Sequence, residues 1–364
     1  MFTSWRFLQI GTLALALSAC AAPQSQPAPG PSNPPVSVGK EAAAPAPASA
    51  NLDLDLTAYV KALASERSLP EEQLRTILGG AQYNPTVAKL IAPAVASGRK
   101  IVRSWTVYRK RVVEPVRIRW GVDFWNDNQA TLDLAAQRYG VPPEIIVAII
   151  GVETNYARNM GSFSVLDALY TLGFKYPDPS RPDRQQMFRN QLSAFLDLVM
   201  AGKLDLGTQG SYAGAIGMSQ FMPGSIERYA VDGDGDGIID LANSPKDAIL
   251  SIGNFLTAHG WQRGLPVFAP VSLPADPASL VDGGLEPHLT WQQVQGAGGR
   301  LAAGASGAPW TNQKLGVINL PDDQYGTVQY RTGTPNFFAL THYNRSYFYA
   351  TSVADLASEL KARR

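Results

Sequence analysis

The chain has 364 residues, a formal net charge of +1, 45% hydrophobic residues and 17% charged residues. This length is enough for about two domains of roughly 150 residues each. A net charge so close to zero excludes the strong basic excess typical of nucleic-acid-binding proteins, so no nucleic-acid partner is expected. No apolar run reaches the roughly 20 residues that a membrane-spanning helix needs.

The first residues have the pattern of a signal peptide, which we assign to residues 1–19. Arg6 precedes a low-charge stretch that is too short to span a membrane. The stretch ends directly before Cys20, the only cysteine of the sequence, in an arrangement that resembles the bacterial lipobox. The residue directly after the cysteine is Ala21, which matches the pattern of lipoproteins that are sorted to the outer membrane. We therefore expect a membrane anchor through a lipid on Cys20, at the periplasmic face of the bacterial outer membrane. The alternative is an ordinary signal peptide with a chance cysteine.

Residues 20–50 are predicted to be a lipidated linker. They contain eight prolines and many alanines, a composition that precludes helix and sheet and favours an extended spacer. Because Cys20 is the only cysteine, no disulfide is expected, and the fold must be stabilised by its core alone.

Residues 51–120 are predicted to be an N-terminal helical region. One of its helices is expected to begin at residues 68–72, where Ser68 supplies a capping hydroxyl and a proline and two acids follow. Paired glycines at 79–80 end this helix. The next expected helix, over 123–139, is closed by a glycine and belongs to the region that follows.

Residues 121–263 are predicted to be a helical core. Within it, residues 142–153 combine two prolines with an unbroken apolar run, which is typical of a helix buried on nearly all sides. The isoleucine and valine content makes a buried parallel strand the competing prediction, but a proline followed by an acid in the first turn favours the helix. Two further helices are expected, an amphipathic one over 188–199 and a capped one over 244–260.

The pattern changes between residues 264 and 335, where proline and glycine dominate and no helical period is visible. This part is predicted to be a small β-rich insert with three short β-prone runs. The runs are 267–268, 317–320 and 327–330. Residues 336–364 are predicted to return to helix and to finish with a closing helix over 353–363. The expected fold class is therefore mainly α (α+β).

Glu153 is the one carboxylate of the apolar run. A carboxylate at the end of an otherwise apolar helix should have a raised pKa, because desolvation disfavours its charged form. A raised pKa suits a glycosidic general acid that must hold its proton near neutral pH. The alternative is a structural glutamate paired with Arg158 or another base, and the helix pattern alone does not separate the two.

Three sequence motifs surround this candidate in a fixed order. They are Ile-Gly-Val-Glu-Thr-Asn-Tyr at 150–156, the glycine-rich segment at 210–225, and Tyr-Asn-Arg-Ser-Tyr-Phe-Tyr-Ala at 343–350. With residues 105–109 and 124–125, they resemble the lytic murein transglycosylase B family (glycoside hydrolase family 103). The resemblance extends over roughly residues 55–362.

This resemblance implies a lysozyme-like core that cleaves the β-1,4 bond between N-acetylmuramic acid and N-acetylglucosamine in peptidoglycan glycan strands. It implies that Glu153 alone acts as acid and then as base, closing the muramoyl C6 hydroxyl onto C1 to leave 1,6-anhydromuramoyl ends. A hydrolase normally needs two carboxylates. The alternatives are a hydrolysing muramidase with Asp167 or Asp183 as second acid, and a catalytically silent, calcium-dependent wall-binding lipoprotein.

The motifs also supply candidate substrate contacts. Ser211 and Gln220 lie in glycine-rich turns, where backbone can approach a ligand closely; a helix cap and a satisfied core amide are the respective alternatives. The resemblance implies that Tyr343 and Asn344 orient the glutamate and stabilise positive charge at C1. Tyr108 and Tyr349 are predicted to be further substrate-binding residues, although each tyrosine alone is more often a core residue.

The sequence departs from the commoner family pattern in two places. Asn-Tyr-Ala at 155–157 replaces a more usual Thr-x-Tyr/Trp-Gly, and Met-Ser at 218–219 replaces Tyr-Gly or similar. Neither departure affects the acid itself; both concern the detail of the substrate contacts.

Residues 232–243 match an EF-hand loop, with acids at positions 1, 3, 5 and 9 and glycine at position 6. The predicted metal ligands are Asp232, Asp234, Asp236, the Ile238 carbonyl, Asp240 and Asn243. Asparagine at position 12, where a bidentate glutamate is normal, should weaken binding. We expect a structural Ca²⁺ ion here, with an unfilled acidic loop as the alternative, and no cofactor is required for the chemistry.

Overall fold

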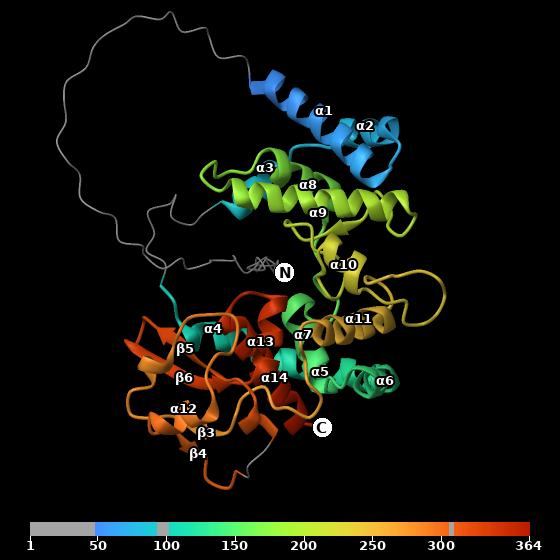
Figure 1. The fold of residues 1–364 in the computed structure, drawn as a ribbon. Helices are drawn as coiled ribbons and strands as arrows, with labels where there is room; N and C mark the ends of the chain where they lie inside the picture. Colours follow the sequence, from blue (N-terminus) through green and yellow to red (C-terminus); the bar gives the residue numbers. More distant parts are fainter. Residues whose placement is uncertain (1–47, 93–101, 306–308) are drawn as a thin grey trace, which may run out of the picture. The chain divides into compact units, whose positions relative to one another are not determined.

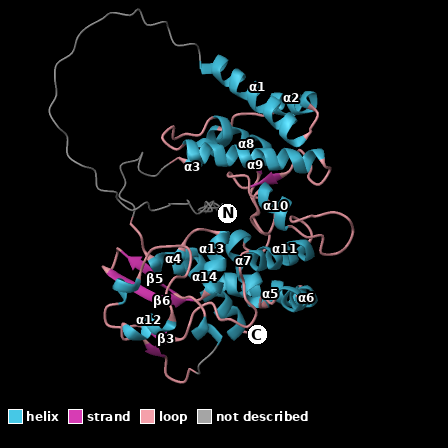
Figure 2. Cartoon of the chain, in the orientation of Figure 1, coloured by secondary structure: helices cyan, strands magenta, loops and turns pink. Residues whose placement is uncertain are grey.

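The computed structural model describes residues 48–92, 102–305 and 309–364. The chain divides into two units, residues 1–42 and 43–364, and the first of them lies outside the described residues. So do the predicted signal peptide, Cys20 and most of the predicted linker. The described part has fourteen α-helices and three two-stranded antiparallel sheets (Figures 1 and 2). This confirms the predicted mainly α fold class. No described helix is long and apolar enough to cross a membrane.

The N-terminal helices are α1 (Ala48–Arg67), α2 (Glu71–Gly80) and α3 (Pro85–Ile91). Helix α1 starts before the predicted end of the linker at residue 50. Helix α2 begins and ends where the sequence predicts, but the predicted cap is wrong. Ser68 adopts a left-handed φ of 55° just after α1, and the N-cap of α2 is Pro70, which makes no side-chain cap.

The next three helices are α4 (Trp105–Val112), α5 (Pro115–Asp127) and α6 (Gln129–Tyr139). The single helix predicted over 123–139 is therefore wrong, because the chain leaves helical geometry at Asn128. The Asn128 side chain donates to the Phe124 carbonyl at 2.9 Å, which satisfies one of the last carbonyls of α5.

Helix α7 (Pro143–Thr154) forms the centre of the core. The helix prediction is confirmed and the strand alternative is wrong. Its apolar residues are buried because α5, α6, α11 and α14 (Tyr347–Ala362) pack around it. Figure 1 shows α14 in red beside α7 in green. Glu153 is the penultimate residue of this buried helix.

The segment after α7 forms a helical layer and a loop that returns to the core. Its elements are β1 (Phe163–Ser164), α8 (Val165–Phe174), α9 (Pro182–Met200), β2 (Gln209–Gly210), α10 (Pro223–Tyr229) and α11 (Pro245–Ala258). Strands β1 and β2 pair antiparallel, which draws the glycine-rich segment back toward the end of α7. The amphipathic helix predicted over 188–199 lies within α9, and Ser244 caps α11 as predicted.

The predicted insert has short strands and a small core of its own. Its elements are β3 (Val271–Ser272), η2 (Pro277–Leu280), α12 (Trp291–Gly296), β4 (Arg300–Leu301), η3 (Pro309–Asn312), β5 (Gly316–Asp322) and β6 (Thr327–Gly333). Strands β5 and β6 form an antiparallel hairpin, and β3 pairs with β4. The small core consists of Leu265, Ala269, Val294, Trp310 and Leu315. Helix α12, with its Thr290 capping box, was not predicted.

The chain ends in α13 (Pro335–Tyr343) and α14. The closing helix predicted over 353–363 starts earlier, at Tyr347, because the Ser346 hydroxyl accepts a hydrogen bond from the Tyr349 amide and caps it. This earlier start places Tyr349 in the first turn of a helix that packs against α7.

Candidate active site

Glu153 lies half-buried at the end of α7. Burial raises its pKa to about 7, because the surrounding protein disfavours the charged form. The Tyr349 hydroxyl donates to Glu153 Oε1 at 2.6 Å, which favours the ion and lowers the pKa, but burial is the larger effect. The alternative of a structural pair with Arg158 is not found, because that side chain donates to backbone carbonyls and lies over the Trp120 ring.

Three tyrosines from three helices surround this carboxyl group. Tyr108 comes from α4, Tyr343 ends α13, and Tyr349 starts α14. The rings of Tyr343 and Tyr349 are stacked, 6.3 Å apart and 15° from parallel. Burial and, after it, the negative charge of Glu153 raise the pKa of all three hydroxyls. They are therefore protonated at neutral pH, and those of Tyr343 and Tyr349 donate hydrogen bonds within the protein.

The glycine-rich loop is fastened to the end of α7 and to α13. The Thr154 hydroxyl lies 3.4 Å from the Met218 carbonyl, and the Tyr343 hydroxyl donates to the Ser219 carbonyl at 2.6 Å. Gly217 has a φ of +69°, and a Cβ atom there would lie 2.4 Å from the Leu241 carbonyl oxygen. Only glycine fits this position without a shift of the backbone. These contacts bring the loop beside Glu153.

Ser211 and Gln220 both support this loop. The Ser211 hydroxyl accepts hydrogen bonds from the Ala213 and Ala215 amides, so it caps a turn rather than a helix. Gln220 has a left-handed φ of 49°, and its side-chain nitrogen donates to the carbonyls of Met160 and Gly217. Among the described residues no donor contacts the Gln220 side-chain oxygen, which leaves this atom for a ligand.

Asn344 follows α13 as its C-cap residue and is half-buried. Its carbonyl accepts a hydrogen bond from the Ser346 amide. Within the described part of the chain, no hydrogen bond links the Asn344 side chain to Glu153 or to the tyrosines. The structure therefore brings the predicted tyrosines to the glutamate and leaves this amide beside them.

The turn after Glu153 is strained, which the sequence does not reveal. Asn155, Tyr156 and Ala157 are three consecutive non-glycine residues with φ between 50° and 65°. A left-handed backbone costs a residue other than glycine or asparagine roughly 1–2 kcal/mol, so the cost falls mainly on Tyr156 and Ala157. The Thr154 hydroxyl accepts a hydrogen bond from the Ala157 amide at 3.1 Å and helps to hold the turn.

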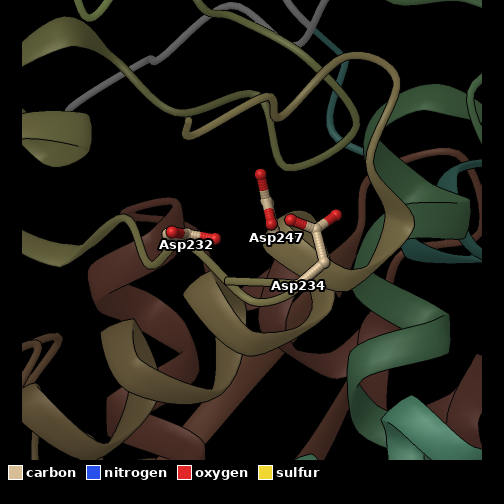
Figure 3. Close-up of side chains that lie close together, drawn as sticks. All are labelled: Asp232, Asp234 and Asp247. Atoms are coloured by element: carbon tan, nitrogen blue, oxygen red, sulfur yellow. The ribbon is translucent and has the colours of Figure 1, made fainter. Parts of the chain in front are cut away.

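The predicted calcium loop brings three carboxylates together, but not the predicted set. Oxygens of Asp232, Asp234 and Asp247 lie within 4.8 Å of one another (Figure 3). Asp247 was not predicted. It is 1% exposed in the first turn of α11, and its two oxygens accept hydrogen bonds from the amides of Gly233 and Asp240. The carboxylate therefore faces the loop from inside the fold.

The predicted role of Asn243 as the ligand at position 12 stays a prediction. Its side-chain nitrogen donates to Asp240 at 2.9 Å, and Asp240 also accepts from two backbone amides of the same turn. This contact does not use the Asn243 side-chain oxygen, which is the atom through which an asparagine binds calcium. Asp236 and Ile238 are exposed in the loop, and their role as ligands stays a prediction.

The donor set of this loop fits a hard cation. Calcium prefers carboxylate and carbonyl oxygens, and the three gathered carboxylates supply them. Within residues 48–92, 102–305 and 309–364, no basic side chain forms an ion pair with Asp232, Asp234 or Asp247.

The family model described as transglycosylase SLT domain matches residues 54–358, from α1 to α14. The chain belongs to this family. It is also 37% identical over 317 residues to the membrane-bound lytic murein transglycosylase B of Escherichia coli (strain K12), covering 84% of this chain and 82% of that protein. The family predicted from the motifs is confirmed.

Solved structures of lytic transglycosylases have the same fold. The soluble lytic transglycosylase SltB1 from Pseudomonas aeruginosa has a TM-score of 0.74 at 37% identity, covering 85% of this chain and 99% of that one. An Escherichia coli lytic transglycosylase in complex with calcium has a TM-score of 0.71 at 35% identity, with 85% and 93% covered. SltB3 from Pseudomonas aeruginosa in complex with NAG-anhNAM-pentapeptide has a TM-score of 0.70 at 28% identity, with 85% and 79% covered.

In this member of the transglycosylase SLT family, neither suggested second acid faces Glu153. Asp167 accepts a hydrogen bond from the Gln82 amide at 2.8 Å. Asp183 is exposed and pairs with Arg181 at 3.0 Å, and a hydrogen bond from this arginine lowers its pKa. Among the described residues no carboxylate contributes to the raised pKa of Glu153.

Proposed function

We propose that this chain is a lytic transglycosylase that cleaves the β-1,4 bond between N-acetylmuramic acid and N-acetylglucosamine in peptidoglycan and leaves 1,6-anhydromuramoyl ends. One observation carries the proposal: Glu153 has a pKa of about 7, is held by Tyr349, and has no second carboxylate beside it in the described part of the chain. The Escherichia coli relative, a lytic murein transglycosylase, and the SltB3 complex with an anhydromuramoyl ligand support it.

Glu153 acts in two steps. In its protonated form it donates its proton to the glycosidic oxygen, and the bond from that oxygen to muramoyl C1 breaks. The resulting carboxylate and the tyrosine oxygens face the positive charge that develops at C1. The muramoyl C6 hydroxyl then attacks C1 and returns its proton to Glu153. No water is consumed, and the carboxyl group ends in its starting form.

The surrounding residues orient the sugar. The Gln220 side-chain oxygen and the Ser211 hydroxyl contact the sugar or its N-acetyl group from the glycine-rich loop. Tyr343 and Asn344 stabilise positive charge at C1, and Tyr108 contacts the substrate from α4. Tyr349 fixes the orientation of the Glu153 carboxyl through its 2.6 Å hydrogen bond.

Mass spectrometry of the fragments released from purified peptidoglycan tests the proposal. The wild-type protein should release 1,6-anhydromuramoyl fragments, and Glu153→Gln should release none while it stays folded. The control Asp183→Asn should be as active as the wild type. Fragments heavier by one water, together with an inactive Asp183→Asn, would support a hydrolysing muramidase instead. A wild-type protein that binds peptidoglycan and releases nothing would support the wall-binding alternative.

We also propose a structural Ca²⁺ site formed by Asp232, Asp234 and Asp247, with Asp236 and the Ile238 carbonyl as further ligands. The convergence of the three carboxylates supports it, as does the related Escherichia coli enzyme that was solved with calcium. The ion would brace the segment between Gln220 and α11. It takes no part in the chemistry.

Finally, we propose that the chain is held at the periplasmic face of the outer membrane by a lipid on Cys20. The lipobox-like sequence supports this proposal, as does the membrane-bound relative. Lipid-modified cysteines with two or three acyl chains anchor stably, whereas one chain alone is marginal.

A further inference from the structure

The strained turn after Glu153 has to be held in place by its neighbours. Asn155, Tyr156 and Ala157 have φ values of 50°, 60° and 65°. Residues in sparsely populated backbone regions persist only where the surrounding structure holds them, and they cluster at functional sites. The turn begins two residues after Glu153. A contact that holds the turn therefore acts on the end of α7, next to Glu153.

One such contact comes from Arg117 in the first turn of α5. Its Nε atom donates to the Asn155 side-chain oxygen at 2.8 Å. The Arg117 side chain is only 12% exposed, and burial lowers its pKa. Guanidinium donors buried to this degree must find acceptors in the protein, because unsatisfied buried donors are costly.

The same guanidinium also reaches the end of α4. Its Nη1 atom donates to the carbonyls of Arg111 at 2.5 Å and Val112 at 2.6 Å. These are among the last carbonyls of α4, which have no partner within the helix. Nη2 lies 3.5 Å from Glu114, which partly balances the charge. Arg117 therefore joins the turn after α7 to the end of α4.

The turn after α7 and the end of α4 each adjoin a helix that carries a residue of the candidate site. Helix α7 carries Glu153, and α4 carries Tyr108. The negative charge of Glu153 and the positive charge of Arg117 both act on the Tyr108 hydroxyl, in opposite directions. A single planar group in α5 thus links the turn that follows the acid to the helix that carries one of its neighbouring tyrosines.

We infer that Arg117 is a positioning residue for Glu153 and Tyr108, an inference that rests on the proposed function. Lysine keeps the positive charge, but its single compact ammonium group cannot reach both the Asn155 side chain and the α4 carbonyls in a fixed geometry. A misplacement of about 1 Å in an active site can cost about 100-fold in rate.

The test is the rate of release of anhydromuramoyl fragments by Arg117→Lys, measured as kcat and KM and followed against pH. We expect kcat to fall by about 10- to 100-fold and KM to change much less, because Tyr108 is only one of several substrate contacts whereas Glu153 is the single proposed acid. The limb of the kcat–pH profile that reports Glu153 should also shift. Asn155→Ala removes the same hydrogen bond from the other side and serves as the second variant if Arg117→Lys does not fold. The double variant should be no slower than the slower single variant.

Arg189→Lys is the matched control. Arg189 is 19% exposed, its Nε atom donates to the Gly173 carbonyl at 2.7 Å, and it pairs with Asp55. None of these partners touches Glu153. This variant should lose stability as Arg117→Lys does, but keep its kcat.

Three results would overturn this inference and leave the proposed function standing. The first is an Arg117→Lys variant that is as active as an active wild type. The second is a change confined to KM, and the third is a pair of rate losses in Arg117→Lys and Asn155→Ala that add in full in the double variant. A wild type that releases no fragments would overturn the proposed function and this inference with it.

Discussion

Glu153 couples the stability of the protein to pH as well as its activity. Its pKa is 4.5 in the absence of burial and about 7 in the folded protein. At a pH between these two pKa values, Glu153 is protonated in the folded protein and deprotonated in the unfolded chain. The free energy of unfolding therefore falls as the pH rises through this window. Glutamine at this position keeps the acceptor for Tyr349 and has no charge to bury.

We therefore expect Glu153→Gln to be inactive but more stable than the wild type at pH 8, by about 3 kcal/mol. The gain should vanish at pH 4, where both states of the wild-type glutamate are protonated. Denaturant unfolding of both proteins at pH 4, 6 and 8 measures the difference. A difference in unfolding free energy that does not change with pH would contradict the raised pKa.

Ala157 occupies a conformation that suits glycine. Its φ is 65°, and its amide is held by the Thr154 hydroxyl. Ala157→Gly should therefore raise the free energy of unfolding by about 1 kcal/mol, because the steric conflict of the Cβ atom is removed. The control is Ala136→Gly inside α6, where the same change should destabilise the protein by about 1 kcal/mol. If Ala157→Gly lowered the free energy of unfolding as Ala136→Gly does, the turn would not be strained.

At the scale of elements, the calcium loop and α11 form one unit through Asp247. We expect Ca²⁺ to raise the melting temperature of the wild type. An ion present at about 100 times its dissociation constant stabilises the folded state by about 2.7 kcal/mol. Asp247→Asn should abolish this response, because it removes one of the three gathered carboxylates. Asn243→Ala should weaken the response less, because it removes at most one neutral oxygen. Calorimetry with Ca²⁺ and with a chelator measures both. The reverse order of effects would contradict Asp247 as a ligand.

The elements also show what a sequence can reveal about this site. Glu153, Ser211, Gln220 and Tyr349 lie in continuous motifs, so their proximity in the fold could be expected from the family pattern. Asp247 was missed because a twelve-residue template ends at Asn243, whereas the position of this carboxylate depends on where α11 begins.

Contacts between segments that lie far apart in the sequence leave no continuous motif from which they could be predicted. The hydrogen bond from Arg117 to Asn155 joins residues 38 positions apart and depends on how α4, α5 and α7 pack. The break at Asn128 was missed because a helix-compatible sequence continues on both sides of it. Local motifs thus predicted the chemistry, and the packing that positions the chemistry became visible only in the structure.

At the scale of the whole molecule, the proposed anchor and the catalytic part are separable. The residues around Glu153 come from α4, α7, the glycine-rich loop, α13 and α14, all within residues 105–349, whereas Cys20 precedes them by a proline-rich stretch. Cys20→Ala should therefore move the protein from the membrane fraction to the soluble periplasmic fraction, because the acyl chains supply the membrane affinity. Its rate on purified peptidoglycan should match that of the wild type. Fractionation with labelled fatty acid and the fragment assay measure the two effects. A variant that stays in the membrane fraction would contradict the lipid anchor, and one that loses activity on free peptidoglycan would contradict the separation of the two parts.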